Sequence, residues 1–211
     1  CLMCVVLQQT LAKPVSFSGI GLHSGNDVSM TLLPAPPNTG VVFRRVDLEN
    51  RTEIPAQVEY ITETSRSTTI AKSEVKVQTV EHVLASLAGF RITNAIIEVD
   101  SNEPPIADGS SREFCKMILD SGIQEQKEKV EPIVITEAID YLHDETIMSI
   151  LPYDGLKITC TSSDKSGRFT QFFSIDVTVG SWKKEIAHAR TFCFYEEIEF
   201  LIKNGLIRGG S

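Results

Sequence analysis

The sequence is poor in basic residues and has no long apolar run. Lysine and arginine together number 20, against 28 aspartates and glutamates, and the formal net charge is −8. A surface of this sign lacks the positive field on which non-specific nucleic-acid binding depends. The apolar run at residues 1–7 is too short to span a bilayer, and no basic region precedes it as in a signal peptide. We therefore expect a globular cytoplasmic protein that binds no nucleic acid and has no transmembrane segment.

Cysteines are few, and the zinc-protease motif H-E-x-x-H is absent. The five cysteines form an odd, irregularly spaced set, which does not fit a disulfide framework and favours a reducing compartment. Cys1 and Cys4 form a single C-x-x-C pair, which without a second pair is weak support for a metal or redox site. The missing H-E-x-x-H argues against a zinc protease.

Hydrophobic periodicity predicts an α+β protein that begins with short strands. Val28, Met30 and Leu32 alternate with polar residues, so they should share the buried face of one strand. Residues 94–99 have the composition of another strand. Strands and helices are therefore mixed along the first half of the chain.

Two helices are predicted between and after these strands. The first covers 80–88, with Thr79 as its N-cap and Gly89 as its stop. The second covers 111–121 and begins at a capping box in which Ser110 and Glu113 occupy the two required positions.

A charged stretch at 124–129 divides the chain. We interpret residues 125–130 as a linker between a first α+β domain at 8–124 and a second at 131–211. The second set is again rich in strands, and its expected elements are strands near 132–139, 146–151, 156–161 and 169–178 and a helix at 195–204. Because about 80 residues are few for a complete second domain, we expect the sequence to be cut at its C-terminus.

Glu81 and His82, in the first turn of the helix at 80–88, are the main candidates for chemistry. The helix dipole and the free backbone N–H groups favour a carboxylate at Glu81. Adjacent helix positions differ by about 100°, so both side chains can approach one site, as a general base and a metal ligand would. From spacing alone, a dipole-favoured Glu beside a structural His is the simpler interpretation, since no second His or Cys lies nearby at ligand spacing.

Other features have two interpretations each. His23, which lies among closely spaced glycines, is either a turn residue or a site residue. Thr191 could offer its hydroxyl to an oxyanion, although most such hydroxyls bond to local backbone. An apolar set near the C-terminus is either ordinary core or the wall of an apolar ligand channel. It comprises Phe192, Phe194, Ile198, Leu201 and Ile202.

Several segments, spread over essentially the whole chain, match one known family in that family's order. They are Gly19-Ile20-Gly21-Leu22-His23-Ser24-Gly25, Asn38-Thr39-Gly40-Val41 with Arg44-Arg45, Ser67-Thr68-Thr69, Thr79-Val80-Glu81-His82-Val83-Leu84-Ala85-Ser86-Leu87, Pro105-Ile106-Ala107-Asp108-Gly109-Ser110, Ala189-Arg190-Thr191-Phe192, and Gly205-Leu206-Ile207-x-Gly209-Gly210-Ser211. In these segments the sequence resembles the LpxC family of bacterial zinc deacetylases. That family removes the acetyl group from UDP-3-O-acyl-N-acetylglucosamine at the committed step of lipid A synthesis.

The resemblance implies a fold, a cofactor and roles for particular residues. The family fold is two similar α+β domains whose helices pack between two sheets, with the active site at their junction. By resemblance, His82 is a zinc ligand, Glu81 is the general base and Thr191 helps to hold the oxyanion. An insert at about 192–210, with a strand-helix-strand order, lines an acyl-chain passage. The implied substrate contacts are Phe192, Phe194, Ile198, Leu201 and Gly210, with His23 and Asp108 as supporting residues of the site.

One departure from the family pattern keeps a second hypothesis open. The family's remaining zinc ligands belong to an H-K-x-x-D motif beyond the G-G-S segment, and this sequence has no such motif. We therefore expect residues 1–211 alone to bind zinc poorly and to be inactive, because catalytic zinc uses three protein ligands. The alternative is a non-catalytic relative that binds a UDP-sugar or an acyl ligand. In either case the expected partner is a small molecule, and the protein is expected to be a monomer.

Overall fold

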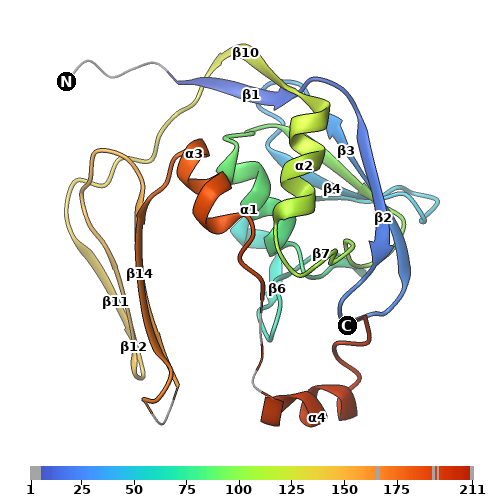
Figure 1. The fold of residues 1–211 in the computed structure, drawn as a ribbon. Coiled ribbons are helices and arrows are strands. Elements are labelled where there is room, and N and C mark those ends of the chain that lie inside the picture. Colours follow the sequence, from blue (N-terminus) through green and yellow to red (C-terminus); the bar gives the residue numbers. More distant parts are fainter. Residues whose placement is uncertain (1–5, 165–166, 192, 194, 210–211) are drawn as a thin grey trace.

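A five-stranded mixed sheet forms the centre of the computed structural model, which describes residues 6–164, 167–191, 193 and 195–209 (Figure 1). In spatial order its strands are β2 (Val15–Ile20), β3 (Asp27–Pro34), β9 (Ala95–Val99), β4 (Val41–Arg45) and β5 (Glu53–Pro55). Strands β4 and β9 are parallel, and the other neighbours are antiparallel. Smaller elements flank this sheet: η1 (Val58–Tyr60), a sheet of β6 (Ile61–Glu63), β7 (Thr69–Lys72) and β8 (Val75–Val77), and a pair of β1 (Leu7–Leu11) with β10 (Ile123–Lys129).

Two helices cover one side of the five-stranded sheet and close the core. They are α1 (Glu81–Gly89) and α2 (Arg112–Ser121), and Figure 1 shows both on the same side of the strands. The predicted face of Met30 and Leu32 is completely buried, and it packs in one cluster with Leu87 of α1 and Phe114 and Ile118 of α2. Burial of such side chains stabilises the fold by roughly 1.5–3 kcal/mol each. The core is therefore the layer between sheet and helices.

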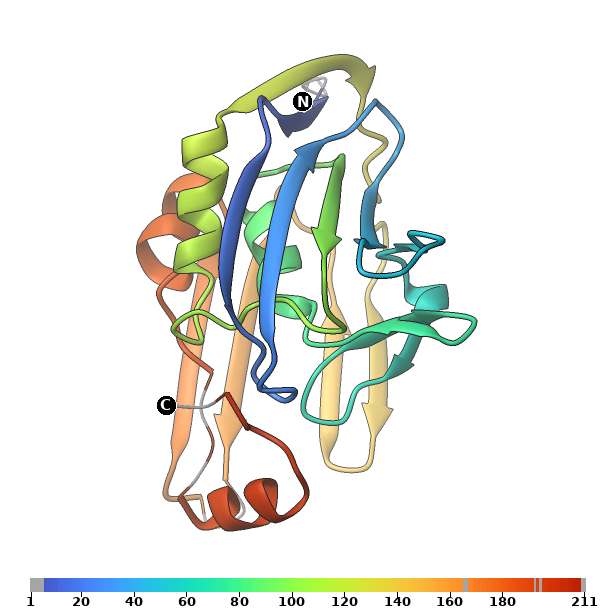
Figure 2. The same ribbon diagram turned by 90° about the vertical axis from the view of Figure 1, so that its right-hand side faces the viewer.

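The second half of the chain contains two hairpins and short helices. The hairpins are β11 (Ile139–His143) with β12 (Thr146–Ile150) and β13 (Lys157–Ser163) with β14 (Thr170–Asp176), and the helices are α3 (Val179–Ser181), the π-helix η2 (Trp182–Ile186) and α4 (Tyr195–Lys203). Nearly all hairpin residues are exposed, and both hairpins extend away from the core (Figures 1 and 2). Within the described ranges, no helix is long and apolar enough to cross a membrane.

The predicted α+β class is confirmed, and most predicted elements lie within two residues of their observed positions. The helices predicted at 80–88 and 111–121 are α1 and α2, and the helix predicted at 195–204 is α4. Of the strand-helix-strand insert expected at about 192–210, the described residues include only the helix. The division into domains at 8–124 and 131–211 stays a prediction.

Both predicted N-caps are wrong, although α1 ends at Gly89 as predicted. Helix α1 has Val80 as its N-cap, with no side-chain cap, because the hydroxyl of Thr79 donates to a carboxylate oxygen of Glu103 instead. The N-cap of α2 is Ser111, also without a side-chain cap. The Ser110 hydroxyl donates to Asp108 and accepts from the backbone N–H of Arg112. Each hydroxyl is used in the loop before its helix rather than in the helix itself.

The charged stretch predicted as a linker is strand β10, which pairs antiparallel with β1. Its Gln126 accepts a hydrogen bond from the buried Asn94 side chain at 2.7 Å, and Asn94 also donates to Gln8 of β1. A buried amide needs such partners, and they fix this polar segment against the core. The strand predicted at 132–139 is absent, since no strand occupies 130–138 in the described chain.

Trp182 anchors the second half of the chain to the helical layer. Its ring is 9% exposed, and its indole N–H donates to the Cys115 thiol at 3.4 Å. Burial raises the pKa of that thiol, which keeps Cys115 protonated. The ring lies directly over Gly89 at the end of α1, where a Cβ atom would overlap it. The fold therefore requires a residue without a side chain at position 89.

We predict that Gly89→Ala lowers the free energy of unfolding by about 1–3 kcal/mol, because the added methyl forces the Trp182 ring to shift. Urea denaturation of the variant and of the wild type measures the difference. Ala88→Ser, at the exposed neighbouring position, serves as the control and should change stability by less than about 0.5 kcal/mol. Equal effects of the two substitutions would show that the ring does not press on Gly89.

Candidate active site

Glu81 opens helix α1 and is held by the loop before strand β7. Its Oε2 accepts a hydrogen bond from the backbone N–H of Thr68 at 3.0 Å, and the residue is half-buried. Glu81 lies in the first turn of α1, where the positive end of the helix dipole favours a carboxylate. The carboxylate of Glu81 is thus fixed in orientation at the start of α1.

His82 follows on the same turn and is also half-buried. Burial lowers the pKa of its imidazole, and the neighbouring Glu81 opposes this shift by favouring the charged form. The Ser86 and Ser111 hydroxyls donate to the His82 backbone carbonyl at 2.9 and 3.1 Å. The ring is therefore neutral near pH 7, the form in which histidine binds a metal through a ring nitrogen.

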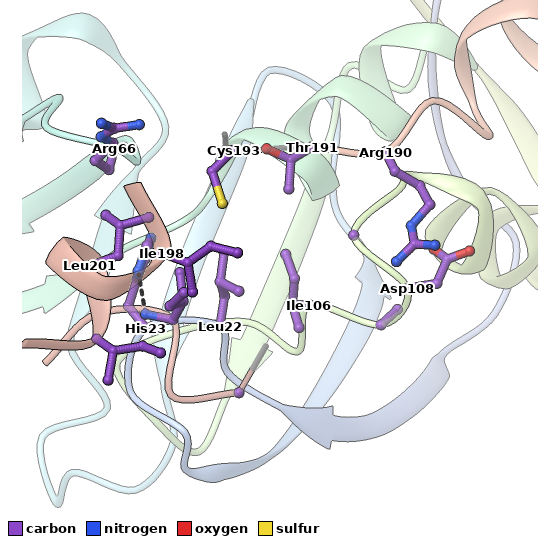
Figure 3. Close-up of a pocket in the computed structure, with 15 residues that line it drawn as sticks. Leu22, His23, Arg66, Ile106, Asp108, Arg190, Thr191, Cys193, Ile198 and Leu201 are labelled. Atoms are coloured by element: carbon purple, nitrogen blue, oxygen red, sulfur yellow. Dashed lines mark hydrogen bonds between the residues drawn. The ribbon is translucent and has the colours of Figure 1, made fainter. Parts of the chain in front are cut away.

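A cavity of about 420 Å³ brings together many of the predicted site residues (Figure 3). Its wall is mainly apolar, with a few polar side chains among the lining residues. The lining residues are Leu22, His23, Arg66, Ile106, Ala107, Asp108, Gly109, Arg190, Thr191, Cys193, Ile198, Leu201, Ile202, Ile207 and Gly209. A hollow of this size with few polar groups is typical of a small-molecule site.

Thr191 and Asp108 lie on the same side of this cavity. The backbone N–H of Thr191 donates to the carbonyl of Gly109 at 2.9 Å, which ties the 190–191 segment to the loop before α2. Hydrogen bonds from Ser110 hold the pKa of Asp108 below its ordinary value, and the cations of Arg112 and Arg190 add to the shift. Figure 3 shows the Arg190 guanidinium directed at Asp108. Asp108 is thus an ionised support for the loop that carries Thr191.

His23 lies in the cavity wall, on the turn between β2 and β3. It is 8% exposed, its Nδ1 accepts from the backbone N–H of Ile207 at 3.4 Å (dashed in Figure 3), and its Nε2 has no partner in the described part of the chain. Its own backbone N–H donates to both carboxylate oxygens of Glu103. The turn is thereby connected to Glu103 on one side and to the segment after α4 on the other.

Helix α4 supplies the outer wall of the cavity. Ile198 and Leu201 line it, and Leu201 is 3% exposed. Glu197 of α4 forms an ion pair at 2.6 Å with Arg66, in the loop before β7. After the helix, the backbone N–H of Gly209 donates to the carbonyl of Leu22 at 2.9 Å. The wall is attached at both ends to loops of the first half of the chain.

The structure therefore groups some predicted residues and separates others. His23, Asp108, Thr191, Ile198 and Leu201 line one cavity, whereas Glu81 and His82 are not part of its lining. The closest connection is the loop at 66–68, where Arg66 lines the cavity and Thr68 binds Glu81. The expected substrate contacts Phe192, Phe194 and Gly210 lie outside the described residues.

Only part of a metal site is present among the described residues. His82 offers one neutral ring nitrogen, and no group of three His, Cys, Asp or Glu side chains comes together in the described ranges. A catalytic metal needs about three protein ligands and an open position. The residues described here fit one ligand and one carboxylate of such a centre, and not the whole ligand set.

Sequence reasoning missed Glu103 and Arg66. Glu103 is completely buried, although glutamate is ordinarily exposed, and no pattern around it marks a buried acid. It lies two residues before the family-matching segment that begins at Pro105, so no matched motif included it. Arg66 is an exposed loop residue whose role depends on a helix more than 100 residues later. Local sequence contains no information about that pairing.

Comparison with known proteins shows which family this sequence resembles. The family model described as UDP-3-O-acyl N-acetylglycosamine deacetylase matches residues 8–211. The UDP-3-O-acyl-N-acetylglucosamine deacetylase of Idiomarina loihiensis is 43% identical, with 98% of this chain and 69% of the relative aligned. The enzyme of the same name from Myxococcus xanthus is 42% identical over 97% of this chain and 65% of the relative. The bifunctional enzyme LpxC/FabZ of Chlorobaculum tepidum is 39% identical over 97% of this chain and 44% of its own length.

The matched region thus spans about two thirds of the single-function relatives, and it contains both the start of α1 and the cavity. With the family model aligned from strand β1 to the end of the chain, this protein belongs to the LpxC family of UDP-3-O-acyl N-acetylglycosamine deacetylases.

Proposed function

We propose that this chain carries part of the active site of a zinc-dependent deacetylase that hydrolyses the acetamide of UDP-3-O-acyl-N-acetylglucosamine, the committed step of lipid A biosynthesis. The observation that carries the proposal is the start of α1. There a carboxylate fixed by the Thr68 N–H stands beside a neutral, half-buried imidazole, in a chain 43% identical to a relative with this activity in its name. Amide hydrolysis needs both a proton acceptor and a means of polarising the carbonyl.

Each residue has a definite part in this proposal. His82 is one zinc ligand, and zinc, when bound, supplies a Lewis acid that polarises the amide carbonyl and acidifies the attacking water. Glu81 accepts the proton of that water, because its carboxylate is already oriented by the Thr68 N–H. The hydroxyl of Thr191 donates to the oxygen on which negative charge develops. Asp108 and the Gly109 carbonyl hold the loop and backbone that position Thr191.

We propose that the cavity binds the acyl chain of the substrate. Its apolar wall of Ile106, Ile198, Leu201 and Ile202 suits a hydrocarbon, and its volume of about 420 Å³ is that of a small-ligand site. By family resemblance, Phe192, Phe194 and Gly210 add further substrate contacts. His23 supports the wall from the turn between β2 and β3.

The setting of the reaction follows from its substrate. A nucleotide-linked sugar is a molecule of the cytoplasm, so we place the protein there. We also propose that it acts as a monomer.

A second candidate function is a non-catalytic relative that binds a UDP-sugar or an acyl ligand. The absence of a three-ligand cluster among the described residues favours it, while the ordered Glu81 favours the enzyme. Deacetylation of UDP-3-O-acyl-N-acetylglucosamine by a protein that contains this sequence separates the two. Binding of the substrate without release of acetate would support the second candidate.

We predict that Glu81→Ala lowers the turnover rate of the active protein about 10²- to 10⁴-fold, because the general base is lost. Bound zinc, measured by mass spectrometry, should stay at the wild-type level. Glu113→Ala removes the equivalent first-turn glutamate of α2 and controls for the helix-dipole effect. A rate near wild type in Glu81→Ala would refute the general-base role.

We predict that His82→Ala weakens zinc binding itself. The loss should exceed the roughly 10- to 100-fold effect that is typical of changing an outer partner of a ligand. Competition with a fluorescent chelator measures the affinity. His143→Ala, at an exposed histidine, is the control and should leave the affinity unchanged. Unaltered zinc affinity in His82→Ala would show that this histidine is not a ligand.

We predict that the polypeptide of residues 1–211, purified alone, holds zinc weakly and has no deacetylase activity, because one histidine cannot form a three-ligand site. Native mass spectrometry after dialysis measures the zinc content. A Cys1→Ser, Cys4→Ser double variant controls for metal held by the C-x-x-C pair. Tight, stoichiometric zinc that persists in this control would contradict the prediction.

A further inference from the structure

Five donor–acceptor contacts from two distant segments converge on the carboxylate of Glu103. The backbone N–H of His23 donates to Oε1 and Oε2 at 3.0 and 3.1 Å, and that of Ser24 donates to Oε2 at 2.8 Å. The Thr79 hydroxyl donates to Oε1 at 2.7 Å, and the Gln78 amide lies at 3.4 Å from Oε2. Glu103 itself is 0% exposed. It therefore joins the turn between β2 and β3 to the residues just before α1.

The chemistry of this position requires an ionised carboxylate. Every group around it is a donor, and a carboxylate is the side chain that only accepts. Burial alone would raise its pKa, but the hydrogen bonds from Ser24, Thr79 and His23 bring the pKa below its ordinary value. An amide of the same shape would direct an NH2 group at N–H donors. The site is thus built for a negative charge.

The turn between β2 and β3 is already closed by its own backbone. The N–H of Gly21 donates to the carbonyl of Asn26, and the N–H of Gly25 donates to the carbonyl of Gly21, at 2.9 and 3.0 Å. Glu103 is therefore not needed to form the turn. What it adds is a connection between the turn and Thr79, whose hydroxyl is unavailable as a cap for α1 because Glu103 accepts it.

Thr79 has an unusual backbone that this connection maintains. Its φ is 57°, in the left-handed region that β-branched residues rarely occupy. Such a conformation persists when surrounding contacts hold it. Because Thr79 is two residues before Glu81, its conformation sets the direction in which α1 begins. The Glu103 carboxylate is one of the contacts that fix it.

Two glycines extend the connection to the cavity. A Cβ at Gly21 would lie 2.6 Å from Oε2 of Glu103, so the carboxylate reaches the turn only because this residue is glycine. A Cβ at Gly209 would overlap the Gly21 carbonyl, so the segment after α4 also depends on close approach to the turn. Leu22 and His23 of the same turn line the cavity. Contacts thus run without interruption from the start of α1 to the cavity wall.

We propose that Glu103 is a positioning residue that fixes Thr79, and through it Glu81 and His82, relative to the turn that carries Leu22 and His23 into the cavity wall. The proposal deepens the proposed deacetylase function and rests on it, because that function is what makes the start of α1 and the cavity two parts of one active site. Glu103 touches neither site directly, and it acts through the backbone on either side.

The test compares Glu103→Gln and Thr79→Val with two matched controls in the deacetylase that contains this sequence. Thr79→Ser keeps the hydroxyl that donates to Glu103, and Glu98→Gln changes another hydrogen-bonded glutamate, bound to Arg44 and Arg51. Steady-state kinetics give kcat and KM, and amide NMR spectra follow the signals of His23 and Ser24.

Thr79→Val should lower kcat about 10- to 100-fold, because misplacement of a catalytic group by about 1 Å can cost 10²-fold, while KM changes less than about threefold. It should also shift the His23 and Ser24 amide signals, although the substitution is more than 50 residues away in sequence. Glu103→Gln should lower kcat at least as much. Both controls should behave as wild type.

Wild-type kcat in Thr79→Val, or unmoved His23 and Ser24 signals, would overturn the positioning role, and this holds even if Glu103→Gln fails to fold. A wild-type protein that deacetylates nothing while Thr79→Val still moves the two amide signals would instead refute the deacetylase assignment. The two failures are therefore distinguishable.

Discussion

The carboxylate of Glu103 is removed from water, and a buried charge persists only where hydrogen bonds replace its hydration. This requirement constrains the backbone around it. Two successive N–H groups, of His23 and Ser24, must point inward, and Thr79, two residues before α1, must turn its hydroxyl toward the same point. Glycine at position 21 leaves the room for this. One buried anion therefore connects the turn beside the cavity to the residues from which α1 starts.

The sheet topology explains how Glu103 reaches both segments. Strand β9 runs antiparallel to β3, with Val99 opposite Met30, so the end of β9 lies near the start of β3. The turn between β2 and β3 lies at that same end of the sheet, and the loop after β9 passes beside it. The site residues on this side of the cavity are thus brought together by strand order rather than by proximity in sequence.

Sequence patterns located the elements well and the contacts between them poorly. Periodicity placed α1 and α2 within one residue, because an apolar face against a core is a local signal. The N-cap at Ser110 failed because a competing local partner, Asp108, accepts its hydroxyl. The N-cap at Thr79 failed for the opposite reason: its hydroxyl donates to Glu103, 24 residues away, which no local pattern records. The same applies to β10, whose charged residues suggested a linker. Its pairing with β1 is a contact over more than 100 residues.

The residues of the candidate site also fall into those found from sequence and those found only from the structure. Glu81, His82 and Thr191 were identified because they occur in short segments that match a family, and the resemblance supplied their roles. Glu103 could not be found by that reasoning, since its importance is visible only as burial and as converging donors. Arg66 required knowledge that α4 returns to the loop before β7. Residues that act through geometry become evident only when the geometry is known.

The two sides of the cavity differ in how firmly they are held. The side at His23 is fixed by buried hydrogen bonds to an anion, and such bonds resist solvent and salt. The side at α4 depends on the apolar contact of Leu201 and on the ion pair between Arg66 and Glu197, both of which are partly exposed residues. Exposed ion pairs contribute little to stability because water and salt screen them. A firmly held side at His23, connected through Glu103 to the start of α1, and a weakly attached apolar wall at α4 suit the proposed reaction, in which the acetamide must be placed accurately while the acyl chain needs only an apolar space of adequate length.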